Sequence, residues 1–166
     1  MKRAIKFTVL NILLIFFDQF TKHLAKNKLM GNDGWDLIPG VFKLQYLENR
    51  GAAFGMFQNQ LLFLIPVTII IFLGIIYIYG RIPREKRFLP LEYLCIFISA
   101  GAIGNFIDRV LNNYVVDFLY FELINFPIFN VADCYVTISA VLLLVLGLFY
   151  YKEEDFQFLV KKKSMK

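Results

Sequence analysis

The chain has 166 residues, of which 58% are hydrophobic and 19 are phenylalanine, and its mean hydropathy is positive. A soluble domain of this size does not need so much apolar sequence for its core, so the composition indicates an integral membrane protein. The formal net charge is +5, but the basic residues gather at the ends of apolar runs and form no nucleic-acid-binding pattern, so we expect no nucleic-acid partner.

The first apolar run starts at Ala4, after a basic N-terminus, and no small-residue cleavage site follows it. Asp18 and Lys22 come at helical spacing, four residues apart. We therefore predict an uncleaved membrane helix over about residues 4–22. The first interpretation of Asp18 with Lys22 is an ion pair at the far end of this helix.

The next segment, residues 23–60, carries turn residues and then an extended-looking stretch, VFKLQYL. This pattern predicts a small β-sheet outside the membrane. The sequence ENRGAAFGMF, from Glu48 to Phe57, combines polar residues with two glycines that permit close backbone approach. We interpret it as an amphipathic segment in the membrane interface.

Three further apolar runs complete the predicted bundle, and the run from Leu61 to Tyr79 is free of charge. We predict an all-α membrane protein with a small extracytoplasmic β-sheet and one domain, 1–166. Its helices cover about 4–22, 61–80, 88–109 and 133–151, and its extracytoplasmic segments about 23–60 and 110–132. Basic residues at both termini and from Arg81 to Arg87 place the termini in the cytoplasm by the positive-inside rule.

Several kinds of catalytic site find no support in the sequence. His23 is the only histidine and no H-E-x-x-H pair exists to hold zinc, so we expect no metal site. Ser99 and Ser139 lie in apolar runs without a base at helical reach. Cys134 has no neighbouring histidine or cation to favour its thiolate. These residues are interpreted as packing residues.

Carboxylates at the outer membrane boundary remain as candidates for chemistry. Asp117 lies in the extended-looking VVDF, and Asp133 lies at the start of the fourth predicted helix. Two carboxylates held close together do not both ionise easily, so one can activate water while the other protonates a leaving amine. The alternatives are a helix cap for Asp133 and a plain loop carboxylate for Asp117.

The third aspartate of this region favours a structural interpretation. Asn105, Asp108 and Arg109 fall at i, i+3 and i+4 of the third predicted helix, so we expect a polar network there. Two other classes of function stay open on the residues alone. A small transporter would also place aspartates in membrane helices, although the polar residues of this chain gather at one side of the membrane. A scaffold subunit would use the aspartates only as caps and ion pairs.

Five short motifs together resemble the lipoprotein signal peptidase family, also called signal peptidase II. They occur in the family's order and cover nearly the whole chain. The motifs are DQFTK (Asp18–Lys22), NRGAAFG (Asn49–Gly55), GNFIDR (Gly104–Arg109), VVDF (Val115–Phe118) and FNVAD (Phe129–Asp133).

The resemblance implies a membrane aspartic endopeptidase that removes signal peptides from diacylglyceryl-modified prolipoproteins, on the N-terminal side of the lipidated cysteine. It implies Asp117 and Asp133 as the catalytic pair. The motif positions that it implies to line or support the site are Asp18, Lys22, Asn49, Gly51, Asn105, Asp108, Arg109 and Asn130. Our own hypothesis adds Arg50 and Phe54 as residues that clamp the substrate.

The resemblance also carries expectations about ligands and location. It implies no metal or organic cofactor, and inhibition by globomycin-type cyclic peptides. The location that it implies is the bacterial cytoplasmic membrane, with the active site at the outer face and both termini in the cytoplasm. We expect a monomer that contacts membrane lipids and lipidated precursors.

Overall fold

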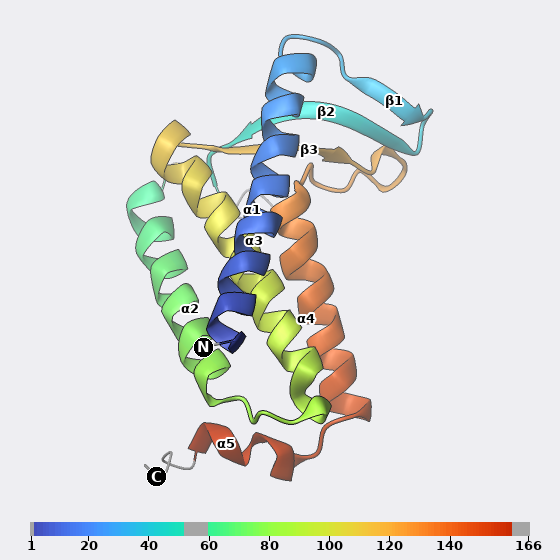
Figure 1. The fold of residues 1–166 in the computed structure, drawn as a ribbon. Coiled ribbons are helices and arrows are strands. Elements are labelled where there is room, and N and C mark those ends of the chain that lie inside the picture. The colour runs from blue at the N-terminus through green and yellow to red at the C-terminus, as the bar shows by residue number, and fades with distance from the viewer. Residues whose placement is uncertain (1, 52–59, 161–166) are drawn as a thin grey trace.

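The computed structural model describes residues 2–51 and 60–160. Its long helices are α1 (Lys2–Leu29), α2 (Leu61–Arg81), α3 (Leu89–Asn112) and α4 (Val131–Phe149). All four are long and apolar enough to cross a membrane, α3 together with the preceding η2 (Lys86–Phe88). Helix α3 packs against each of the other three and forms the centre of the bundle (Figure 1). The predicted class, a four-helix membrane protein with a small sheet, is confirmed.

The sheet lies at one end of the bundle, where it crosses the outer turns of α1 (Figure 1). It contains β1 (Trp35–Ile38), β2 (Phe42–Asn49) and β3 (Val115–Tyr120) in the order β1-β2-β3, all antiparallel. The register pairs Asn49 with Val115 and Leu47 with Asp117. This pairing brings the end of β2 beside the first residues of β3.

The remaining elements are short. They are η3 (Glu122–Ile124) after β3, and η4 (Glu153–Phe156) with α5 (Gln157–Val160) after α4. Figure 1 shows α5 below the end of the bundle that is opposite to the sheet. Of the predicted interfacial segment, Glu48 and Asn49 belong to β2, and the part from residue 52 lies outside the described residues.

The helix boundaries differ from the predicted ones by a few residues at several ends, and two of these differences have a clear physical reason. Helix α1 continues seven residues beyond the expected end at Lys22, because Asp18 and Lys22 find partners on α3 and need no water. It ends before Gly31, whose φ of +79° suits a glycine after a helix. Helix α4 starts two residues early because Asn130, not Asp133, is its N-cap.

The extension of α1 supports the sheet. Ala25 and Leu29 form a buried apolar cluster with Val116 and Phe118 of β3. All four side chains are less than 9% exposed. Since β3 carries Asp117, the extra turns of α1 hold this strand against the bundle.

Buried polar pairs connect α1 to α3 at several depths. Near the α5 end, Arg3 Nε lies 3.0 Å from Glu92 Oε1. In the middle, Ser99 Oγ donates a 2.7 Å hydrogen bond to Asn11 Oδ1. Polar residues therefore do not gather at one side of the membrane only, contrary to our expectation. Their pairing fixes the register of α1 on α3, because a shifted helix would leave polar groups unsatisfied.

Helices α3 and α4 approach most closely where α3 has glycine. A Cβ atom on Gly101 would lie 2.6 Å from the Ala132 carbonyl oxygen and 2.7 Å from Val136 Cγ2. Real Cβ atoms essentially never come this close to other atoms. The backbone contact therefore requires glycine at this position, in the way that small residues generally allow membrane helices to meet.

We predict that Gly101→Ala lowers the melting temperature of the purified protein in detergent, because the added methyl group pushes α4 away from α3. Overpacking of this kind costs about 1–3 kcal/mol. Gly147→Ala is the matched control, since a methyl group added to this glycine of α4 would meet no heavy atom within 4 Å. Equal melting temperatures for the two variants would show that the close contact is not needed.

Candidate functional site

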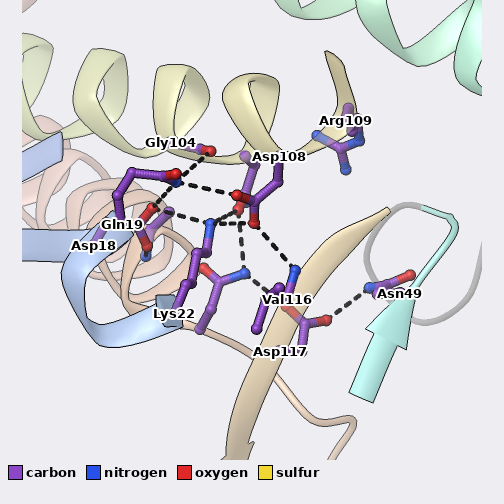
Figure 2. A network of polar contacts seen from close by, with 12 residues as sticks. Asp18, Gln19, Lys22, Asn49, Gly104, Asp108, Arg109, Val116 and Asp117 are labelled. Atoms are coloured by element: carbon purple, nitrogen blue, oxygen red, sulfur yellow. Dashed lines mark hydrogen bonds and ion pairs between the residues drawn. The ribbon is translucent and has the colours of Figure 1, made fainter. Parts of the chain in front are cut away.

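The candidate site is built around the buried ammonium group of Lys22. Its Nζ lies 3.0 Å from Asp18 Oδ2 and 3.1 Å from Asp108 Oδ2, and it donates a 2.8 Å hydrogen bond to Asn105 Oδ1 (Figure 2). Lys22 is 2% exposed. An ammonium group has three protons to donate, so these three oxygens satisfy it completely. The Asp18–Lys22 ion pair is therefore buried and lies inside α1. It does not mark the end of the helix, as the sequence suggested.

Asp18 and Asp108 each also hold a backbone amide. Asp18 Oδ1 accepts a 2.9 Å hydrogen bond from the N–H of Ala132. Asp108 Oδ2 accepts a 3.1 Å hydrogen bond from the N–H of Val116. Ala132 directly precedes Asp133, and Val116 directly precedes Asp117. The ion cluster thus fixes the backbone beside both candidate catalytic residues.

Asp117 is 1% exposed and accepts two amide hydrogen bonds. Asn130 Nδ2 donates to Oδ1 at 2.6 Å, and Asn49 Nδ2 donates to Oδ2 at 2.9 Å. Burial, followed by the charge of Asp133, raises the pKa of Asp117 from 3.8 to about 7. This carboxyl group can therefore carry a proton close to neutral pH.

Asp133 belongs to the first turn of α4, in a capping box with Asn130. The Asn130 N–H donates to Asp133 Oδ2 at 3.1 Å, and the Asp133 N–H donates back to Asn130 Oδ1 at 3.0 Å. Asn105 Nδ2 donates to Asp133 Oδ1 at 2.8 Å. Asn130 is thus the N-cap of α4, and the Asp133 side chain makes the second hydrogen bond of the capping box. Asn130 also donates from its side-chain amide to Asp117, so a single residue joins the candidate pair through its backbone and its side chain.

Arg109 was expected to form a network with Asp108, but the cation that pairs with Asp108 is Lys22. The Arg109 guanidinium donates a 3.2 Å hydrogen bond from Nη2 to the carbonyl oxygen of Gly51. The Gly51 N–H in turn donates to Asn49 Oδ1 at 2.9 Å. Arg109 therefore ties the chain after β2 to α3, close to the side chain that holds Asp117.

Of the two residues expected to clamp the substrate, only Arg50 belongs to the described residues. Arg50 is exposed, and its Nη2 lies 3.3 Å from Glu48 Oε2. Phe54 lies outside the described residues. Within residues 2–51 and 60–160, no group of three histidine, cysteine or acidic side chains could hold a metal ion.

Gln19 is a site residue that the sequence analysis did not single out. Its Nε2 lies 3.1 Å from Asp18 Oδ2, 3.1 Å from the Gly104 carbonyl oxygen and 3.2 Å from Asp108 Oδ1 (Figure 2). It therefore links the two carboxylates that flank Lys22. The sequence feature that could have identified Gln19 is an amide side chain directly beside Asp18 in an apolar helix.

Comparisons with known proteins show which family and fold this chain resembles. A sequence model of the family described as signal peptidase (SPase) II matches residues 10–149. A lipoprotein signal peptidase from Caldanaerobacter subterraneus subsp. tengcongensis is 45% identical over 142 residues, which are 85% of this chain and 94% of the relative. One from Streptococcus thermophilus (strain CNRZ 1066) is 41% identical over 153 residues, 92% of this chain and 97% of the relative.

A solved structure is similar as well. It is a bacterial membrane enzyme determined by the in meso method at 2.3 Å resolution, with a TM-score of 0.78 and 31% sequence identity. The match covers 97% of this chain and 94% of the other. The whole described architecture, helices and sheet together, is therefore that of a known membrane enzyme.

We predict that Lys22→Met strongly destabilises the protein, because it leaves Asp18 and Asp108 buried without their cation. Removing one partner of a buried ion pair costs about 3–5 kcal/mol. Unfolding of the purified protein in detergent measures the loss. Lys28→Met removes an exposed cation from the same helix and should change stability by no more than about 0.5 kcal/mol. A similar effect of both substitutions would rule out the ion cluster as a main source of stability.

We also predict that stability depends on pH through Asp117. Its pKa is higher in the folded protein than in the unfolded chain, so the folded state binds more protons between pH 3.8 and about 7. The stability contributed by this proton is present below this range and is lost as the pH rises through about 7. Wild type should therefore melt at a lower temperature at pH 8 than at pH 5. Asp117→Asn should reduce that difference, and an unchanged difference would contradict the assignment.

Proposed function

Because the chain belongs to the signal peptidase II family, we propose that it is a membrane aspartic endopeptidase acting on diacylglyceryl-modified prolipoproteins. It removes their signal peptides by cutting on the N-terminal side of the lipidated cysteine. The observation that carries this proposal is the pair Asp117 and Asp133, whose carboxyl groups are both held by Asn130, one by its side-chain amide and the other by its backbone N–H. The names of the relatives support the substrate class.

The proposed reaction uses the two carboxyl groups as one acid–base unit. One aspartate takes a proton from water, whose oxygen then forms a bond to the scissile carbonyl carbon. The other aspartate gives its proton to the leaving amine as the carbon–nitrogen bond breaks. The raised pKa of Asp117 means that the pair can hold one proton near neutral pH, which this division of work needs.

The surroundings of the pair suit a substrate that arrives in the membrane. Asp133 opens a membrane-spanning helix, while Asp117 lies in the sheet just outside it. A scissile bond at the membrane boundary can reach both carboxyl groups, and the lipid chains of the substrate stay in the bilayer. We further propose that this boundary is the outer face of the cytoplasmic membrane, with both termini in the cytoplasm, in keeping with the basic short loops.

Other parts of the proposal concern the substrate and the ligands. Arg50, exposed after β2, is proposed to contact the precursor together with Phe54. Globomycin-type peptides are proposed as inhibitors of the same pair. The proposed form is a monomer, and no cofactor takes part in the reaction.

We predict that Asp117→Asn and Asp133→Asn each lower the rate of precursor cleavage by at least about 100-fold, because asparagine keeps the shape but cannot transfer the proton. The measurement is a gel-shift assay with purified protein and a diacylglyceryl-modified precursor. Asp36→Asn, at an exposed position of β1, is the control and should cleave at the wild-type rate.

The same assay separates this proposal from the alternatives. A transporter or a scaffold subunit would show no cleavage even as wild type. Cleavage at the normal rate by either site variant would rule out Asp117 and Asp133 as the catalytic pair, although the protein would still be a peptidase. Melting temperatures of the variants establish that any lost activity is not lost folding.

A further inference from the structure

A groove of about 500 Å³ lies between α3 and α4, along the part of both helices that leads away from the candidate site. Its α3 side consists of Pro90, Tyr93, Leu94 and Phe97, and its α4 side runs from Cys134 to Leu146. The lining exposes almost no polar surface. At about 1.5 Å per residue, the α4 side is roughly 18 Å long. One leaflet of a hydrocarbon core is about 15 Å thick, so an extended acyl chain fits the length of this groove.

The groove begins on α4 at Cys134, directly after Asp133, and runs away from the carboxylate pair. Above it, α3 and α4 are in contact at Gly101, where no side chain fits against Ala132. The Phe97 and Tyr135 rings meet edge to face at 5.6 Å, and the Tyr135 hydroxyl donates a 3.3 Å hydrogen bond to the Leu14 carbonyl oxygen. Phe97 and Tyr135 both line the groove, so these contacts lie at the end of the groove nearest the pair. The large residues below Gly101 keep the two helices apart and leave the gap open to lipid.

A first cation stands at the other end of the groove. Lys6 Nζ lies 4.9 Å from the ring centroid of Tyr93, which lines the groove. Lys6 also contacts the Glu92 carboxylate, which Arg3 shares. Two cations for one carboxylate leave this corner positively charged. The Lys6 side chain is 29% exposed, so an anion can reach it.

A second cation flanks the same end. The Arg87 guanidinium carbon lies 5.0 Å from the ring centroid of Tyr150. The Tyr150 N–H donates a 2.9 Å hydrogen bond to the carbonyl oxygen of Leu146, the last residue of the groove on α4. Arg87 pairs with Asp155 at 2.6 Å, yet its side chain is 41% exposed. Among the described residues, this end of the bundle also carries the exposed cations Lys2, Arg84, Lys86 and Lys152, together with the exposed acids Glu85, Glu153 and Glu154.

We propose that the groove binds one acyl chain of an anionic phospholipid from the leaflet at the α5 end, with the phosphate group beside Lys6 and Arg87. The apolar walls would accept any acyl chain, and the cations add the preference for an anionic headgroup. The diacylglyceryl group of a precursor carries no phosphate, and its peptide has to reach Asp117 and Asp133 at the opposite end. The lipid is therefore a bound component and not the substrate.

Native mass spectrometry of the purified protein in detergent tests this proposal. The protein is titrated with phosphatidylglycerol, phosphatidylcholine and diacylglycerol that carry identical chains. We expect phosphatidylglycerol to bind at least about fivefold more tightly than the other two, and Lys6→Gln to weaken its binding about fivefold. Lys28→Gln, an exposed cation at the sheet end of α1, should bind like wild type. Arg87→Gln is the second headgroup variant, for use if Lys6→Gln does not fold.

A pair of tryptophan variants tests the groove itself. Leu142→Trp fills the groove and should abolish retention of phosphatidylglycerol. Leu144→Trp, on a lipid-facing part of α4 outside the groove, should retain the lipid. Equal retention of all three lipids, or retention by Leu142→Trp, would overturn the proposal. A protein dimer that only Leu142→Trp abolishes would assign the groove to a second copy of the chain and would also overturn it.

Discussion

The structure depends on one buried cation, Lys22, which lies between the carboxylates of Asp18 and Asp108. In a membrane protein such a group is costly unless every charge and proton is paired. Here the pairing also has a geometric effect, because each carboxylate also accepts a backbone N–H, from Ala132 and from Val116. One ammonium group from α1 thereby positions the start of α4 and the start of β3. These are the two places from which the candidate catalytic side chains project.

Further polar contacts between α1 and α3 keep this cation level with its partners. Asn11 and Asp18 of α1 are seven residues apart, as are Glu92 and Ser99 of α3, so the polar contacts recur at every second turn of the helices. A shift of α1 along α3 by one turn would bury several unpaired polar groups at once, and each would cost free energy. Gly104 of α3 adds a second constraint on α1, since it leaves room for the Asp18 carboxylate, whose Oδ2 lies only 2.5 Å from where a Cβ would stand. The register of the helices is thus specified by polar and steric matches, and not by apolar packing, which lipid provides equally well.

The sequence predicted the four helices and the sheet because hydropathy and turn residues are local signals. It did not predict that α1 continues past Lys22, because Asp18 and Lys22 resemble a solvated helix end when their partners on α3 are unknown. For the same reason Asp108 was expected beside its sequence neighbour Arg109, whereas its cation comes from a residue 86 positions away. Motif positions indicated which residues gather in the site. They could not indicate that Asn130 contacts both aspartates, since this depends on how β3 meets the first turn of α4.

Burial of Asp117 close to Asp133 disfavours the charged form of Asp117, as its raised pKa shows. Nothing among the described residues gives Asp117 a direct cation, since its two hydrogen bonds come from the neutral amides of Asn49 and Asn130. A cation in direct contact would stabilise the charged form and remove the proton that an acid–base pair needs. The strong ion pairs therefore contact the backbone one residue before each aspartate of the pair. In the part of the chain that the structure describes, only amide groups hydrogen-bond to the two carboxyl groups themselves. The fold gains rigidity from Lys22 while Asp117, with its raised pKa, can still carry a proton near neutral pH.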